Sequence, residues 1–347
     1  MKTSVFSSGM LLTALSLGLF CGTRAVAQQP EFDPSGAAAG TPSEAPFNPQ
    51  FVEHLKAMAQ GQSPTVMTRD GYWLGHLPGP LDLSHLAGQA GARLTNTSLP
   101  SSYDLRTYGR VTAVRNQSTC GSCWTFATFG SLESDLLTGE SRDLSENNLK
   151  NLHGFDWTPC AGGNGNMSMA YLTRWDGPIN ESDDSYRATD ANTSPAGLTP
   201  QKHVQNVLIL AGRGSALTND ALKTAVMTYG AIHTSMTWDD AAYNAGSAAY
   251  YYSGSASLNH DVTLVGWDDN YSATNFKTAP AGDGAFLIKN SWGSSWGQSG
   301  YFWISYYDSK YALAAGTLSY VWMGSETTAN YTRQYSYDPL GWVSSLG

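Results

Sequence analysis

The stretch that decides the fold is Asn116–Trp124, which reads NQSTCGSCW. Two of the chain's four cysteines, Cys120 and Cys123, lie within it. From Cys123 onward, apolar residues recur at roughly helical spacing. The sequence therefore predicts a helix over Cys123–Leu137, with the Cys123 thiol at its amino-terminal end. The helix dipole favours an anion at that end, and the thiolate is the nucleophilic form of cysteine.

The composition limits the classes of protein to which the chain can belong. It has 347 residues, with 19 Lys and Arg against 28 Asp and Glu, and a net charge of −9. A chain this acidic lacks the basic surface that nucleic acid or an anionic membrane requires, so we expect no nucleic-acid partner. Hydrophobic residues make up 41% of the chain, too many for a disordered protein. Four cysteines are too few for a fold held together by disulfides, so their positions matter more than their number.

The amino terminus has the pattern of a signal peptide over residues 1–27. Lys2 supplies the positive charge, a largely apolar run follows over 5–20, and Ala-Val-Ala at 25–27 gives the cleavage pattern. A membrane anchor is the alternative, but this run is shorter than the about 18–20 apolar residues that a span needs. No later segment is apolar enough to span a membrane. We therefore expect an exported protein, secreted, periplasmic or at the cell surface, in which disulfides can form.

The rest of the chain divides into a leader and a globular region. Residues 28–99 are rich in Pro, Ala, Gly and Gln, with one short helical candidate near 51–59, and are expected to be a propeptide or a linker. From about Leu99 the first half carries helical patterns and the second half strand patterns, which predicts an α+β protein with two lobes. The expected elements of the second half are a helix that Asn219 caps, that runs to Tyr229 and that Gly230 stops, and strands over 231–238, 262–267, 285–289 and 301–307.

Four motifs follow one another in order over about residues 99–308. They are CGSCW at 120–124, CAGG at 160–163, LNH at 258–260 and KNSWG at 289–293. Together they resemble the motifs of the papain-like cysteine peptidases, in a prokaryotic form. The resemblance implies a helical amino-terminal lobe of about 100–210 and a β-rich, barrel-like carboxy-terminal lobe of about 211–318, with the active cleft between them.

The resemblance also assigns roles to individual residues. Cys123 corresponds to the nucleophile, His260 to the base, and Asn290 to the group that orients the imidazole. Gln117 is at the position of the oxyanion-hole amide, and Trp292 at the position of an indole that screens the His–Asn pair from water. Next to an imidazolium, the pKa of a cysteine thiol can fall from near 8.5 to roughly 3–4.

The remaining implications concern the disulfide, the substrate and the partners. The resemblance pairs Cys120 with Cys160, which leaves Cys123 as the odd thiol, and it lays a substrate backbone against Gly162 and Gly163. The implied function is that of an exported cysteine endopeptidase, made as a zymogen, which hydrolyses peptide bonds through a covalent acyl-enzyme. Its partners are protein or peptide substrates and its own propeptide as an inhibitor. No cofactor and no metal are implied, and the chain is expected to be a monomer.

Two features depart from the family pattern. Asp261 stands where the family usually has a small apolar residue facing S2, the pocket for the second residue before the scissile bond. Either its carboxylate turns away to solvent or backbone, or it lines S2 and favours a polar or basic residue there. In addition, the tail expected at 319–347 contains YDPLGW at 337–342, which resembles the opening of a lectin-like domain that follows the peptidase in some prokaryotic relatives.

Two other classes of function stay open. Cys120 and Cys123 also form a Cys-x-x-Cys redox motif, which predicts a thiol oxidoreductase that depends on Cys120. A catalytically silent binding protein could keep the fold, although the complete set of Gln117, Cys123, His260 and Asn290 argues against it. A zinc site is not expected, because the sequence lacks the second Cys-x-x-Cys pair.

Overall fold

The computed structural model describes residues 46–61, 66–86, 98–137, 139–313 and 317–334. All of them belong to the structural unit that begins at Ala45. The expected signal peptide at 1–27 and the motif at 337–342 lie outside the described residues.

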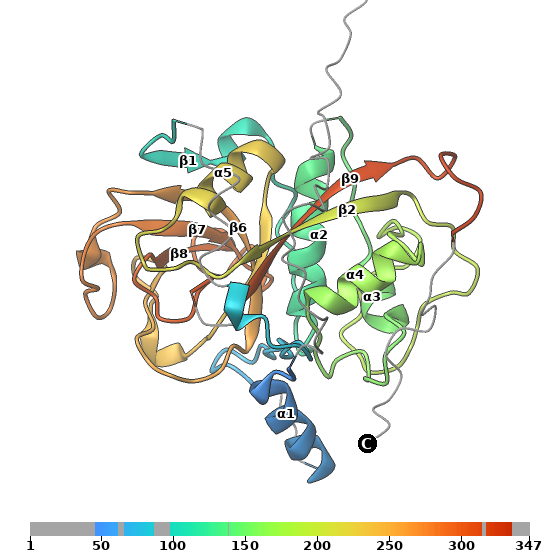
Figure 1. Ribbon diagram of the computed structural model, residues 1–347, viewed down its shortest axis with the longest axis horizontal. Helices are drawn as coiled ribbons and strands as arrows, with labels where there is room; N and C mark the ends of the chain where they lie inside the picture. Colours follow the sequence, from blue (N-terminus) through green and yellow to red (C-terminus); the bar gives the residue numbers. More distant parts are fainter. Residues whose placement is uncertain (1–45, 62–65, 87–97, 138, 314–316, 335–347) are drawn as a thin grey trace, which may run out of the picture. The chain divides into compact units, whose positions relative to one another are not determined.

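A mixed sheet of nine strands forms the centre of the described chain (Figure 1). Its order is β2-β9-β3-β6-β7-β8-β5-β4, and β1 pairs with β6 beside this path. Neighbouring strands are antiparallel except β5 and β8, which run parallel. The path is open, so the sheet is barrel-like only in a loose sense. The strands are β1 (Ser102–Asp104), β2 (His203–Ala211), β3 (Ile232–Met236), β4 (Tyr243–Asn244), β5 (Ala249–Tyr250), β6 (His260–Asp268), β7 (Ala285–Lys289), β8 (Tyr301–Ser305) and β9 (Leu318–Glu326).

Three of the helices, α2, α3 and α4, gather on one side of the strands. In Figure 1, α2, α3 and α4 lie to the right, strands β6–β8 lie to the left, and the long strands β2 and β9 cross between them. This arrangement confirms the α+β class and the two lobes. The helices are α1 (Pro49–Ala59), α2 (Cys123–Leu136), α3 (Glu146–Leu152), α4 (Gly165–Thr173) and α5 (Asp220–Tyr229).

Helix α2 begins at Cys123, as the sequence predicts, and is the most buried helix. Thirteen of its fourteen residues are buried. Its apolar side chains, with Phe129 and Leu132 fully covered, pack into a core shared with α3, α4 and β9. The buried hydroxyl of Thr128 donates to the Trp124 carbonyl at 2.9 Å, so this polar group costs little inside. The helix is therefore a rigid support for whatever stands at its first residue.

The central sheet includes residues beyond 318, where the compact region is expected to end. Residues 318–326 form β9, which lies in the sheet between β2 and β3. Tyr320, Val321 and Trp322 are buried, so this strand belongs to the core. Strand β2 also belongs to the sheet, although the helical lobe was expected to continue to about 210. Neither strand shows a clean alternation of buried and exposed residues, which is why the sequence does not predict them.

The end of helix α5 follows the sequence, but its start does not use the expected cap. The helix spans Asp220–Tyr229, and Gly230 ends it with a φ of 115° that favours glycine. The side chain of Asn219 makes no capping bond. It instead accepts a hydrogen bond from Arg213 at 2.7 Å, which satisfies a buried guanidinium.

The amino-terminal part of the described chain consists of α1 and residues 66–86. Residues 66–86 alone are here called the cover segment. The Asn48 side chain caps α1 by accepting from the backbone N–H of Gln50 at 3.0 Å. The helix buries only Phe51 and His54. The expected leader at 28–99 thus contains ordered structure, and its cover segment reaches the functional site.

Candidate active site

Cys123 lies at the point where α2 meets the sheet. Its Sγ accepts a hydrogen bond from the backbone N–H of Asp261 in β6 at 3.4 Å, and the side chain is fully buried. Residues from the two lobes therefore meet at the sulfur.

The other two described cysteines form a disulfide. Cys120 and Cys160 are bonded, with their Cα atoms 4.7 Å apart, and Cys123 is a free thiol. The bond ties the loop before α2 to the loop before Gly162 and Gly163. The two cysteines of the Cys-x-x-Cys motif are therefore not paired with each other.

His260 is held by two neighbours. Its Nε2–H donates to Asn290 Oδ1 at 2.9 Å, and the Trp292 indole stacks on the imidazole with ring centres 4.9 Å apart. His260 Nδ1 is buried and has no hydrogen-bond partner among the described residues. In a neutral imidazole whose Nε2 carries the proton, Nδ1 is the basic atom. The ring therefore keeps one nitrogen ready to accept a proton.

Gln117 is fixed beside the start of α2. Its Oε1 accepts from the Ser291 hydroxyl at 2.6 Å, which orients the amide. Its Nε2 donates to the carbonyl oxygens of Cys120, at 2.9 Å, and Trp73, at 2.7 Å. Trp73 belongs to the cover segment, so an amide carbonyl of that segment is bound to the same donor that the resemblance assigns to an oxyanion.

The cover segment crosses the cleft and bonds to both walls. On one wall, Gly163 N–H donates to Gly75 C=O at 2.9 Å, and Leu77 N–H donates to Gly163 C=O at 2.8 Å. On the other wall, His76 N–H donates to Asn259 C=O at 3.0 Å. The segment thus lies in the cleft as an added strand, paired through its backbone.

Two positions in the wall of the cleft, Gly162 and Gly163, leave no room for a Cβ atom. A Cβ at Gly163 would stand 2.3 Å from the Trp124 ring. Gly162 has a φ of 116°, and a Cβ there would stand 2.8 Å from the Gly75 carbonyl oxygen. Gly162 therefore lets a peptide backbone lie directly on the wall of the cleft, and Gly163 lets that wall pack against the Trp124 ring of α2.

Tyr72, which the sequence did not predict as a site residue, packs against Trp292. The two rings stack with centres 5.0 Å apart, and the Tyr72 hydroxyl donates to the Trp292 carbonyl at 2.9 Å. The available signal was an aromatic pair, Tyr72 and Trp73, inside a leader otherwise rich in Pro, Ala, Gly and Gln.

With the cover segment in place, the site is held in its uncharged form. Burial, and then the Asp261 carboxylate, raise the pKa of the Cys123 thiol far above its ordinary value, although the backbone N–H groups of Asp261, Gly75 and Trp124 oppose the rise. Burial lowers the pKa of His260 to about 4, against the opposing effects of Asn290 and Asp261. A thiolate was expected at Cys123, and the difference arises because the cover segment excludes water from the Cys123–His260 pair.

Asp261 points into the protein rather than to solvent. Its Oδ1 accepts from Ser235 Oγ at 2.6 Å and from His76 Nδ1 at 2.9 Å. The Nε2 of His233 lies 3.6 Å from Oδ2. Burial by itself would raise the pKa of this carboxyl, but His76 and His233 hold it below its ordinary value.

Within the described part of the chain, two negative findings complete the site. No group of three or more His, Cys, Asp or Glu side chains is arranged to hold a metal ion. No described helix is long and apolar enough to cross a membrane.

The fold and this arrangement define a cysteine protease of the papain type. The papain family of cysteine proteases matches residues 99–321, and the chain belongs to this family.

Two plant proteins illustrate the similarity in sequence. Cysteine proteinase 15A of Pisum sativum is 31% identical over 222 residues, which cover 61% of this chain and 59% of the pea protein. Probable cysteine protease RD19B of Arabidopsis thaliana is 32% identical over 255 residues, which cover 69% of this chain and 67% of that protein. The chain thus spans about three fifths to two thirds of these relatives.

Solved structures give the same result for the fold. The cysteine protease and lectin-like domains of Cwp84, a surface layer associated protein of Clostridium difficile, align with a TM-score of 0.66 and 27% identity, covering 82% of this chain and 61% of that one. Digestive procathepsin L2 proteinase of Tenebrio molitor aligns with a TM-score of 0.56 and 24% identity, covering 78% of this chain and 87% of that one. The second likeness shows the fold alone.

Proposed function

We propose that the chain is an exported cysteine endopeptidase, made as a zymogen, which hydrolyses peptide bonds through Cys123, His260 and Asn290. One observation carries the proposal. The carbonyl of Trp73 is bound to the Gln117 amide at 2.7 Å, while the backbone N–H of the nearby Gly75 faces the Cys123 sulfur. A peptide of the chain itself thus occupies the groove in which a substrate peptide would lie.

The first half of the reaction follows from these positions. Once the cover segment leaves, water reaches the pair, and the proton of Cys123 passes to His260 Nδ1. The thiolate attacks the carbonyl carbon of the substrate, and a C–S bond forms. The negative charge on the oxygen is stabilised by Gln117 Nε2–H and the Cys123 backbone N–H; one such donor contributes about 3 kcal/mol. The imidazolium then gives its proton to the leaving nitrogen, and the C–N bond breaks.

The second half releases the acyl group. Water attacks the thioester carbonyl and gives a proton to His260; the C–S bond then breaks, the carboxylic acid leaves, and the Cys123 sulfur takes back the proton from His260. Asn290 holds the imidazole plane throughout, and Trp292 shields that bond. This is acyl transfer with no redox step, so no further reactant is needed.

Two finer points of the proposal have separate support. The cover segment continues on both sides of Cys123, from Tyr72 on Trp292 to Leu77 on Gly163, so the groove has room on both sides for an endopeptidase substrate. The same contacts block the cleft, which supports a propeptide role for residues 28–99. Export rests on the pattern at 1–27, and the peptidase region is proposed to run from about 100 through β9.

The test is labelling of the thiol, followed by measurement of peptide hydrolysis. We expect the full chain, incubated with reductant, to take up one equivalent of an epoxide thiol inhibitor at Cys123 and to lose hydrolysis of peptides in proportion. Cys123→Ala should abolish both. Thr125→Ala, two residues further along α2, is the matched control and should keep both the labelling and the hydrolysis.

The alternatives give different results. A thiol oxidoreductase would reduce insulin and lose that activity in Cys120→Ala, but Cys120 is bonded to Cys160. A silent binding protein would show neither labelling at Cys123 nor hydrolysis of any peptide, and that result would overturn the proposed function.

A further inference from the structure

We propose that Asp261 makes the pocket beside Cys123 select a positively charged side chain. Preferred substrates then carry Lys or Arg at P2, the second residue before the scissile bond. This inference rests on the proposed function and narrows its substrate class. In the structure the His76 side chain of the cover segment lines this pocket and occupies the position next to the Asp261 carboxylate.

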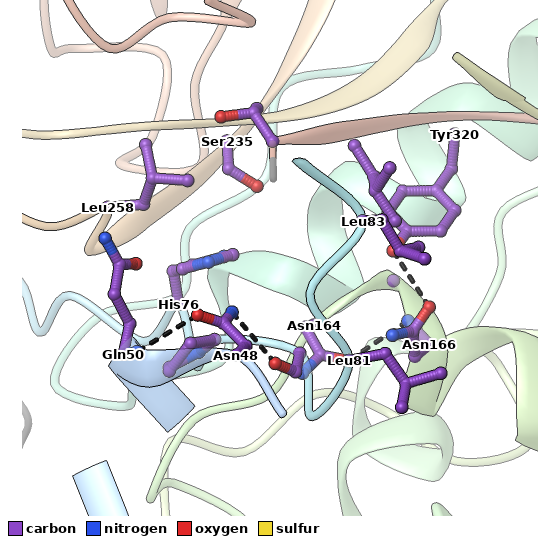
Figure 2. Close-up of a pocket in the computed structure, with 15 residues that line it drawn as sticks. Asn48, Gln50, His76, Leu81, Leu83, Asn164, Asn166, Ser235, Leu258 and Tyr320 are labelled. Atoms are coloured by element: carbon purple, nitrogen blue, oxygen red, sulfur yellow. Dashed lines mark hydrogen bonds between the residues drawn. The ribbon is translucent and has the colours of Figure 1, made fainter. Parts of the chain in front are cut away.

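The pocket lies between the two walls of the cleft. Figure 2 shows His76 beneath Ser235, with Tyr320 and Leu258 on either side. His76 follows Gly75, whose backbone N–H faces the Cys123 sulfur. The side chain beside Asp261 therefore comes from a residue next to the reacting position. About half of the lining residues belong to α1, the residues before it and the cover segment, and the others include Ser235 of β3, Tyr320 of β9, Leu258 in the loop before β6 and Gly165 at the start of α4.

Asp261 is the carboxylate that two lining residues of this pocket, His76 and Ser235, both contact. Its side chain is fully buried, and Oδ1 is the oxygen that receives the His76 Nδ1–H at 2.9 Å. Ser235 Oγ donates to the same oxygen at 2.6 Å. The other oxygen, Oδ2, has no hydrogen-bond partner among the described residues, because His233 Nε2 is 3.6 Å away. The carboxylate therefore receives its hydrogen bonds only at Oδ1, from Ser235 and His76, among the described residues.

Removal of the cover segment changes this balance. Oδ1 then loses the His76 donor and keeps only Ser235, while the surrounding walls still exclude water from much of the group. A buried carboxylate that loses its partner is strongly destabilised, so a cationic side chain that enters the pocket recovers a large interaction. An apolar side chain would cover the carboxylate and leave it without a partner. The site therefore discriminates against substrates with an apolar side chain at P2.

The pocket is thus a cation site that serves two occupants in turn. His76 holds it while the cleft is closed, and a substrate Lys or Arg takes it when the cleft is open. The wall residues Leu258 and Tyr320 can pack along the aliphatic stem of such a side chain while its charged end reaches Asp261.

The test compares substrates that differ only in charge at P2. The full chain is activated under reductant, and active enzyme is counted by epoxide titration. Fluorogenic peptides then carry lysine, acetyl-lysine or leucine at P2. We expect kcat/KM for lysine to exceed that for acetyl-lysine at least tenfold. In Asp261→Asn this ratio should fall to about one, while the leucine peptide is still hydrolysed. Asp268→Asn, on the same strand but outside the pocket, should keep the wild-type ratio.

The outcomes separate the two proposals. A lysine to acetyl-lysine ratio of one or less in the wild type, or an unchanged ratio in Asp261→Asn, overturns the charge selection while leucine turnover upholds the peptidase. Absence of both titratable thiol and hydrolysis overturns the proposed function itself. If Asp261→Asn yields no folded enzyme, the comparison of lysine with acetyl-lysine in the wild type decides alone.

Discussion

Helix α2 reaches the cleft from one side and the amino-terminal part, α1 with the cover segment, reaches it from the other. In α2 thirteen of fourteen residues are buried, whereas α1 buries only two of eleven. The cover segment buries two apolar side chains, Leu74 and Leu77, and is otherwise held by backbone bonds to Gly163 and Asn259 and by side chains such as Tyr72 and His76.

The difference in burial indicates how the cover segment can leave the cleft while α2 and the catalytic residues keep their positions. Apolar burial contributes about 25 cal/mol per Å² and is lost only when the core unfolds. A single hydrogen bond contributes a net of only about 0.5–1.5 kcal/mol, so the few bonds of the cover segment can break together. The nucleophile therefore stands on the permanent part of the molecule, and its cover belongs to the part that can leave.

The largest expected effect comes from preventing the cover segment from seating. A Cβ at Gly75 would stand 1.9 Å from the carbonyl oxygen of Gly121, which is backbone and has little room to move. Overpacking of about 3 kcal/mol corresponds to a factor of about 100. We therefore expect Gly75→Ala to speed iodoacetamide labelling of Cys123 at pH 7 about 100-fold.

The matched control for this change lies in the same segment. A Cβ at Gly79 would meet only the side-chain amide of Asn166, at 3.0 Å, which can turn aside. Gly79→Ala should label at the wild-type rate. Equal, slow labelling of the two variants would mean that the cover segment does not control access to the thiol.

A smaller effect is expected from pH. Burial, with a smaller contribution from His76 of the cover segment, lowers the pKa of His260 from 6.5 to about 4. The closed state, in which the ring is buried, is therefore favoured above pH 6.5, and this advantage is lost as pH falls toward 4. Between pH 7 and pH 5 the loss is about 2 kcal/mol. We expect the amide-exchange protection of Leu77, corrected for intrinsic rates, to fall about 20-fold over this range in a Cys123→Ala chain.

A variant separates His260 from the other groups that face it, which are Cys123, Asp261 and His76. His260→Gln cannot take up the proton, so its Leu77 protection should change little between pH 7 and pH 5. Protection that rises with acid in the wild type would contradict the role given to His260.

The same comparison explains what the sequence could predict. Helix α2 was predictable because its apolar pattern is local and continuous, and Cys123, His260 and Asn290 stand inside recognisable motifs. The cover segment was not, because it pairs with Gly163 through backbone atoms that any residue carries. The direction of the Asp261 side chain was left open for a related reason. It depends on Ser235 and His76, which come from distant parts of the chain and meet only in the fold.

The smallest effect should come from the joint between α1 and the cover segment. Asn48 has two roles there: its Oδ1 caps α1 at Gln50, and its Nδ2 donates to the carbonyl oxygen of Gly79 at 3.0 Å. Loss of a cap costs about 1 kcal/mol, so Asn48→Ala should raise the labelling rate of Cys123 about fivefold. Asn48→Asp keeps the cap acceptor and removes only the Nδ2 donor, so it should give a smaller increase. If Asn48→Ala leaves labelling unchanged while it lowers the helix content of α1, the helix does not help to hold the cover segment, and the bonds to Gly163 and Asn259 hold it without α1.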